Sequence, residues 1–177
     1  YKDFLANGID GIWNDMNEPS VFDGPGGTMP VSNIHLGGGN LPTGTHLMYH
    51  NAYGRLMVEA SYNGILAANP DKRPFVLSRS NILGGQRYAA MWTGDNEATY
   101  EQMKLSVPMS ITLGLSGQPF NGPDIGGFAG NTTADLWGHW LGFGAFFPFS
   151  RGHASCDTNN KEPWAFTKDI ERESRIA

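Results

Sequence analysis

The sequence predicts an α/β protein with a parallel sheet, built as part of a β/α (TIM) barrel. Three observations support this prediction: short apolar runs alternate with helical patterns, the runs have no polar face, and a polar residue follows the end of each run. Strands that alternate with helices form parallel sheets. Strands that are apolar on both faces lie in sheets that are covered on both sides.

Five apolar runs are the predicted strands. They are DGIWND at 10–15, RPFVLSRS at 73–80, YAAMWTGDN at 88–96, GQPFNGPDIGGF at 117–128 and GAFFPFSRGH at 144–153. Between the first two, residues 46–68 carry apolar side chains at near-helical spacing and predict an amphipathic helix. From 19 to 44 the chain has no periodicity and is rich in Gly and Pro. A loop of this length is typical of a lid, a binding loop or a surface insertion.

Capping residues locate two further helices. Thr99 and Gln102 form a possible capping box, which predicts a helix that runs toward Leu115 with a kink at Pro108. Thr132 or Thr133 is expected to cap a short helix through 137 and 141. The charged run at the end of the chain also has a helical pattern.

The positions of the polar residues favour a barrel over an open doubly wound sheet. Toward the C-terminal end of each run lies one polar residue, in order Asp15, Arg79, Asp95, Asp124 and His153. A β/α barrel collects its active site from the carboxyl end of every strand, whereas an open sheet concentrates it at one switch point. A complete barrel needs about 250 residues and eight strands. We therefore expect residues 1–177 to be the later part of one barrel domain.

Composition excludes several classes of function. The formal net charge is −5 and no basic run occurs, which argues against a nucleic-acid partner. No apolar stretch is long enough to span a membrane. The single cysteine, Cys156, excludes an internal disulfide and a cysteine-based zinc site. His46 and His50 lie one helical turn apart, but Leu47 occupies the place where a metalloprotease helix needs Glu, so no metal is expected.

Two carboxylates at strand ends suggest glycoside hydrolysis. Asp15 and Asp95 follow strands that have one predicted strand between them. In glycosidases one carboxylate attacks the anomeric carbon and the other protonates the leaving oxygen, so their environments must keep one ionised and one protonated. The alternative is that both acids are structural, as capping or loop-fixing residues.

Other polar and aromatic side chains fit a sugar site. Arg79 can fork onto a carboxylate or onto sugar hydroxyls. Asp124 and His153 can bind hydroxyl groups. Aromatic side chains can form apolar walls against the ring; the candidates are Trp13, Trp92 and Phe128. Each has a structural alternative, namely an ion pair for Arg79, a hydrogen-bonded histidine for His153, and plain core for Trp92 and Phe128.

These segments resemble glycoside hydrolase family 31, which includes the α-glucosidases. GIWNDMNEPSVF resembles the nucleophile region of that family, MWTGDN its acid/base region, and LSRS its arginine strand. GPDIGGF and FSRGH resemble its next two strand ends. The resemblance covers essentially the whole chain. It implies a β/α barrel of which about the fourth to eighth strands are present.

The resemblance implies a role for each matching residue. Asp15 matches the catalytic nucleophile, Asp95 the general acid/base, and Glu18 a supporting acid beside the nucleophile. Positions that line the subsite for the terminal sugar match Met16, Arg79, Trp92, Asp124, Phe128 and His153.

The expected activity is that of a retaining α-glucosidase acting on α-glucoside oligosaccharides without a cofactor. The DMNEPS form is closer to the α-glucosidase branch than to the α-xylosidase branch. Three alternatives remain open: an α-glucan lyase, a transglucosidase, and a sugar-binding protein without catalysis. Linkage preference, compartment and oligomeric state are not indicated.

Overall fold

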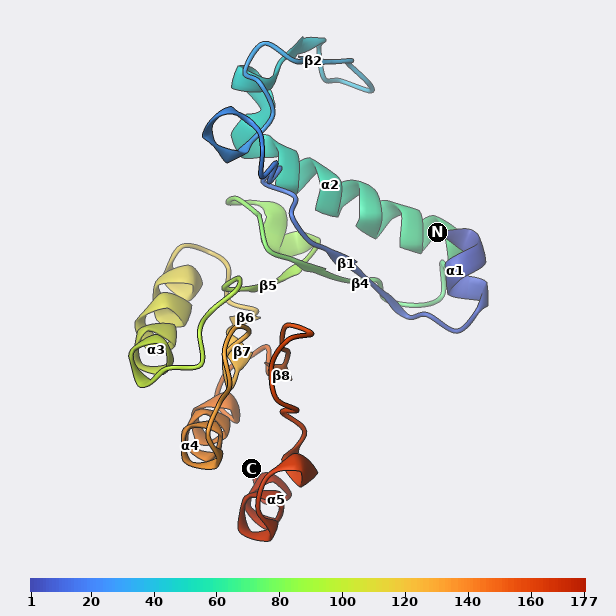
Figure 1. Cartoon of the computed structure of the whole chain (residues 1–177). Coiled ribbons are helices and arrows are strands. Elements are labelled where there is room, and N and C mark those ends of the chain that lie inside the picture. The colour runs from blue at the N-terminus through green and yellow to red at the C-terminus, as the bar shows by residue number, and fades with distance from the viewer. The chain divides into compact units, whose positions relative to one another are not determined.

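The computed structural model describes residues 1–177, which form two compact units, Tyr1–Ala90 and Met91–Ala177 (Figure 1). The first unit holds α1 (Lys2–Ala6), β1 (Gly11–Asn14), β2 (Ile34–His35), β3 (Gly44–Thr45), α2 (His46–Ala68) and β4 (Phe75–Ser78), with short 3₁₀ turns at Pro25–Gly27 and Gly85–Arg87. The second unit holds most of β5 (Ala90–Trp92), α3 (Tyr100–Leu115), β6 (Asn121–Gly122), β7 (Asp124–Ile125), α4 (Ala134–Gly144), β8 (Arg151–Gly152), a 3₁₀ turn at Pro163–Ala165 and α5 (Lys168–Ser174).

The first unit is a strand–helix–strand crossover. β1 and β4 pair in parallel, with Gly11 opposite Phe75 and Asn14 opposite Ser78. α2 connects them and packs against both strands (Figure 1). The sequence prediction of a helix over 46–68 is confirmed with these bounds. Because the strands are parallel and in register, the residues that follow β1 and β4 emerge at the same edge.

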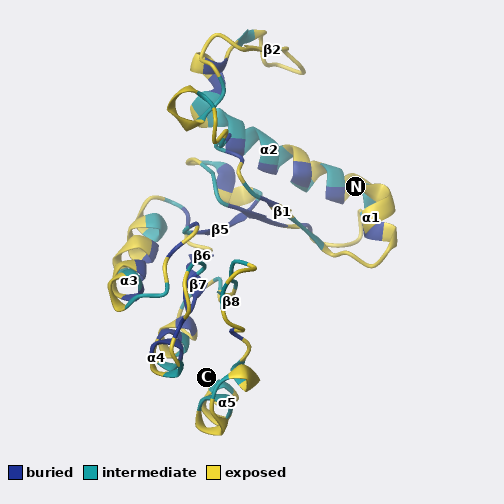
Figure 2. Ribbon diagram, viewed as in Figure 1, coloured by how far each residue is buried: buried dark blue, intermediate teal, exposed yellow.

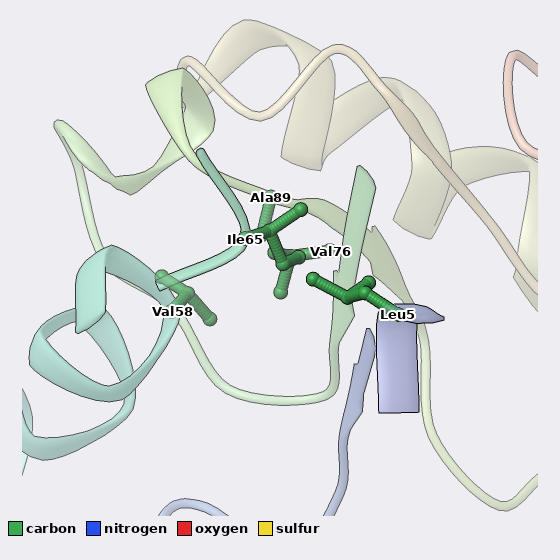
Figure 3. Packing of buried hydrophobic residues seen from close by; sticks show 5 residues of the cluster. All are labelled: Leu5, Val58, Ile65, Val76 and Ala89. Carbon is green, nitrogen blue, oxygen red and sulfur yellow. The ribbon is translucent and has the colours of Figure 1, made fainter. Parts of the chain in front are cut away.

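The core of the first unit lies between α2 and the strands. Val58 and Ile65, two turns apart on α2, meet Val76 of β4, Leu5 of α1 and Ala89 (Figure 3). The buried positions of α2 lie on one side of the helix and the exposed ones on the other (Figure 2). Removing this apolar area from water is the main favourable term that holds the crossover together.

The segment 19–44 contains more order than its sequence pattern suggests. β2, inside it, pairs antiparallel with β3, with Ile34 opposite Thr45 and His35 opposite Gly44. Two-residue strands are too short to leave a periodic signal in the sequence. The backbone N–H of His46 also donates to the carbonyl oxygen of Asn33, which ties this segment to the start of α2.

The second unit corrects two of the predicted strands. The run 117–128 is not one strand but two, because Pro123 has no N–H to donate to a ladder. β6 ends before it and pairs in parallel with β5, whereas β7 begins after it and pairs in parallel with β8. In the run 144–153 only Arg151 and Gly152 form a strand; the phenylalanine-rich part turns, and Phe146 is 89% exposed.

The predicted helix starts of the second unit are confirmed. The Thr99 hydroxyl accepts a hydrogen bond from the backbone N–H of Gln102, and the Thr133 hydroxyl accepts one from Leu136. Thr133, rather than Thr132, is therefore the cap of α4. The core of this unit contains Met103, Ile125, Leu136 and the fully buried Trp140. No helix combines the length and the apolar character that crossing a membrane requires.

Candidate active site

The carboxyl ends of β1 and β4 bring four of the predicted site residues together. Asp15 and Met16 follow β1, Glu18 lies in the next turn, and Arg79 follows β4. The backbone N–H of Arg79 donates to the carbonyl oxygen of Asn14, which continues the strand ladder to the site. Strand register therefore places the arginine opposite the first acid.

Arg79 joins the two acids. Its Nε and Nη2 donate to the two carboxylate oxygens of Glu18, at 2.9 and 3.1 Å. Its Nε also lies 3.4 Å from Oδ1 of Asp15. A bidentate guanidinium–carboxylate pair is a geometrically specific contact. Glu18 thus orients the arginine, and the positive charge of the arginine lies beside Asp15.

The backbone around Asp15 is shaped for this contact. Met16 has a φ of 55°, which is unusual for a residue with a side chain, and its N–H donates to Oδ1 of Asp15 at 2.8 Å. Behind the turn, the buried Asn17 donates to the Ser78 hydroxyl at 2.9 Å. Neither Asn17 nor Ser78 is among the predicted site residues, although Asn17 lies within GIWNDMNEPSVF and Ser78 within LSRS.

In the second unit, Asp95 lies on the surface beside a buried asparagine. Asp95 follows β5 and is exposed, whereas Asn96 is 9% exposed. The Asn96 side chain donates to the carbonyl oxygen of Asp124 at 3.1 Å and accepts the N–H of Phe128 at 2.9 Å. Asn96 therefore links the acid that follows β5 to the turn that follows β7.

Asp124 is fully buried and paired with an arginine that sequence reasoning missed. Nη2 of Arg151 donates to Oδ1 of Asp124 at 2.6 Å, because the two residues face each other across the β7–β8 pair. Oδ2 of Asp124 is also buried and has no hydrogen-bond partner within the chain. The signal was present in the FSRGH segment, where Arg151 precedes His153 by two positions.

The environment of Asp124 makes its carboxyl a weaker acid than usual. Burial raises its pKa to about 6, and the negative charge of Asp95 acts in the same direction. The positive charges of Arg151 and Lys161 oppose this rise. Burial therefore makes the carboxyl of Asp124 easier to protonate than that of an aspartate in water.

Replacing Asp124 with Asn is expected to change how stability depends on pH. A carboxyl whose pKa is raised by folding stabilises the folded state below its unfolded pKa, and this contribution disappears as the pH rises through about 6. Between pH 7 and pH 5 the wild type should therefore gain about 1 kcal/mol in free energy of unfolding relative to Asp124→Asn. Urea denaturation of both proteins at several pH values measures the difference, and a difference that does not vary with pH would contradict the assignment.

The aromatic candidates occupy three different environments. The rings of Phe128 and His153 stack with centroids 5.3 Å apart, and both side chains are half-buried. Trp92 is only 1% exposed, and the Arg151 guanidinium lies over its ring at 5.2 Å. Trp13 is 48% exposed. The Phe128 and His153 rings therefore stack against each other, whereas Trp92 supports the Arg151–Asp124 pair.

No group of three His, Cys, Asp or Glu side chains is arranged to hold a metal ion. His46, at the start of α2, is fully buried, and its ring nitrogens lie 3.2 Å from the Thr28 hydroxyl and 3.0 Å from a ring nitrogen of His35. These contacts explain His46 as a structural histidine that joins the 19–44 segment to α2.

The chain is similar to one protein family and to proteins of known sequence and structure. The model of the glycosyl hydrolases family 31 TIM-barrel domain matches residues 1–177. The chain is 53% identical over 156 residues to a probable glucan 1,3-alpha-glucosidase of Oryza sativa subsp. japonica, covering 88% of the chain and 16% of that protein. It is 50% identical over 165 residues to alpha-glucosidase 2 of Bacillus thermoamyloliquefaciens, covering 93% of the chain and 21% of that protein.

A solved structure agrees with the family match and with the two relatives. The crystal structure of a family 31 alpha-glucosidase from Bacteroides thetaiotaomicron superimposes with a TM-score of 0.85 at 60% identity, covering 99% of the chain and 27% of that structure. The chain thus spans about a sixth to a quarter of the length of these relatives. The match confirms the predicted barrel class. The chain belongs to glycoside hydrolase family 31, as part of its TIM-barrel domain.

Proposed function

We propose that the chain carries both catalytic carboxylates of a retaining α-glucosidase that releases terminal α-linked glucose from oligosaccharides. The observation that carries this proposal is the Asp15 carboxylate at the end of β1, held beside Arg79, in a chain whose relatives are named α-glucosidases. The guanidinium places a positive charge beside the carboxylate that is proposed to act as the nucleophile.

The proposed reaction is a double displacement that needs no cofactor. Asp15 attacks the anomeric carbon while the bond to the leaving oxygen breaks and Asp95 donates its proton to that oxygen. Asp95 then removes a proton from water, which attacks the glucosyl ester and releases glucose with retained configuration. The mechanism requires the two carboxyl groups to lie about 5–5.5 Å apart in the active enzyme.

The remaining site residues are proposed to bind the terminal glucose. The unpartnered Oδ2 of Asp124 supports a role as acceptor of a sugar hydroxyl, because a buried carboxylate oxygen without a partner is costly. The stacked Phe128–His153 pair is proposed to contact the sugar ring. Met16 and Arg79 are proposed to line the site next to Asp15, with Glu18 holding Arg79 and Trp92 supporting Arg151.

We also propose that residues 1–177 form the C-terminal part of a barrel catalytic domain, with 19–44 as a loop inside it. The support is the small share of each relative that the chain spans, together with the presence of at least one strand in each of the five predicted runs. Experiments on activity are therefore designed for the full-length protein that contains this chain.

The test is to follow the first products by proton NMR. Full-length protein is mixed with maltose or with an aryl α-glucoside, and α-glucose is expected to appear before β-glucose. β-Glucose first would contradict retention. An unsaturated sugar would identify a lyase, and larger glucosides a transglucosidase. Absence of any reaction with α-glucosides would refute the proposed activity and favour a sugar-binding protein.

A further inference from the structure

Lys161 is a buried lysine that none of the catalytic steps above uses. Only 7% of its surface is exposed. Its Nζ donates to the carbonyl oxygens of Gly127 and Gly130, the latter at 3.1 Å. A buried ammonium is costly unless it is hydrogen-bonded and has nearby negative charge. The burial of the Lys161 ammonium group therefore indicates a role within the folded unit rather than on its surface.

The turn that Lys161 contacts depends on bonds from outside itself. Gly126 and Gly127 both have a φ of 85°, and Gly130 has a φ of 78°, which favour glycine. A Cβ on Gly127 would lie 2.5 Å from backbone atoms of Ala98. Glycine supplies no side chain to pack, so the conformation of the turn depends on hydrogen bonds to its backbone.

Those hydrogen bonds come from two directions. On one side Asn96, next to Asp95, accepts the N–H groups of Phe128 and Ala129 on its backbone oxygen. On the other side are two residues of the segment that follows His153. The N–H of Ser155 donates to the carbonyl oxygen of Phe128 at 2.9 Å, and Lys161 donates to the carbonyl oxygens of Gly127 and Gly130. Of these three hydrogen-bonding partners of the turn, Asn96, Ser155 and Lys161, only Lys161 has a charged side chain.

That charge balances a buried carboxylate. The positive charge of Lys161 lowers the pKa of Asp124, against the larger effect of burial. In return, burial lowers the pKa of Lys161, and the negative charge of Asp124 opposes that effect. Removing the lysine charge would therefore make protonated Asp124 more favourable, in addition to loosening the turn.

We propose that Lys161 is a positioning residue for the terminal-sugar site, where it holds the 127–130 turn, whose Gly127 N–H donates to the carbonyl oxygen of Asp124 at 3.1 Å. Through the turn it orients Phe128, and its positive charge favours the ionised form of Asp124. This inference rests on the proposed function, since it assigns Phe128 and Asp124 to the glucose subsite.

The test compares Lys161→Met with Lys161→Arg in the full-length protein. Misplaced substrate-binding groups can reduce turnover by about 10²-fold. We expect Lys161→Met to lower kcat by about 10- to 100-fold on both maltose and an aryl α-glucoside. In Lys161→Met the acid limb of the pH profile, where kcat/KM falls as the pH decreases, should move to higher pH, because Asp124 loses a cationic neighbour. Lys161→Arg keeps the charge and two donors, and should recover most of kcat and the original acid limb.

Lys104→Met is the matched control, because Lys104 is exposed on α3 and should leave kcat, KM and the pH profile unchanged. Amide hydrogen exchange of the 126–131 backbone should be faster in Lys161→Met than in the wild type. If Lys161→Met does not fold, Lys161→Gln, which keeps N–H donors without the charge, should still show the shifted acid limb.

A folded Lys161→Met with wild-type kcat, KM and acid limb would overturn the proposal, as would a Lys161→Gln with an unshifted limb. The two proposals fail separately. A wild-type protein without glucosidase activity refutes the proposed function. Unchanged exchange of the 126–131 amides in Lys161→Met refutes the contact of Lys161 with the turn, whatever the activity of the wild type.

Discussion

Asp15→Ala in the full-length protein is expected to lose more than about 10³-fold in kcat on every α-glucoside, because it removes the group that forms the covalent intermediate. Azide should restore bond cleavage, since a small anion fits the space that the carboxylate leaves and carries the same charge. It attacks from the face that Asp15 occupies, so the product should be β-glucosyl azide, with inverted configuration. Product NMR with an aryl α-glucoside measures both the rescue and the anomer.

The matched control for this variant is Asp71→Ala. Asp71 is an exposed acid in the turn before β4, at the opposite end of the strand pair from Asp15. Its replacement should leave turnover unchanged. Near-normal activity in Asp15→Ala, or azide rescue that yields α-glucosyl azide, would rule out Asp15 as the nucleophile. Circular dichroism and thermal melting should accompany both variants, because Arg79 loses a carboxylate neighbour in Asp15→Ala.

Asp95→Ala should show an effect that depends on the leaving group. A general acid typically contributes about 10²- to 10⁴-fold, and a leaving group that departs without a proton does not need it. We therefore expect a loss in kcat/KM of about that size on maltose and a much smaller loss on a nitrophenyl α-glucoside. Steady-state kinetics on a series of aryl glucosides of different leaving-group pKa measure this dependence.

The second half of the reaction gives an independent readout for Asp95. Without the general base, the glucosyl ester on Asp15 should accumulate, and azide should accelerate its breakdown because azide needs no deprotonation. The product is then α-glucosyl azide, the opposite anomer from that of Asp15→Ala. Equal losses on activated and unactivated substrates would show that Asp95 is not the acid. Glu101→Ala, an exposed acid on α3, serves as the control.

The proposed chemistry agrees with the electrostatics within each unit. In the first unit Arg79 lies between Asp15 and Glu18, so that one cation faces two carboxylates. In the second unit Arg151 and Lys161 act on Asp124 together with the negative charge of Asp95. Both arrangements place an arginine directly on a carboxylate, so that opposite charges meet in each unit.

Local sequence patterns were sufficient for the fold class and for most elements. Apolar spacing over 46–68 predicted α2, and Thr99 marked the start of α3. For α4 the sequence left Thr132 and Thr133 as alternative caps, and the structure shows Thr133. The order of strand-end motifs also predicted the family, which the comparisons confirm. The helix predictions depend on residues within one or two turns of each other, where hydrogen bonding to the nearest backbone and burial of one face decide the conformation.

Other features required the tertiary structure because they join residues far apart in the chain. The sequence by itself determined that acids and an arginine follow the strands, but not that Glu18 and Arg79 form a bidentate pair or that Arg151 faces Asp124. It also did not show that Lys161 reaches back to Gly127 and Gly130. The physical reason is that strand register and the positive-φ glycines of the turn set which side chains meet, and a shift of one residue in register turns a side chain to the other face.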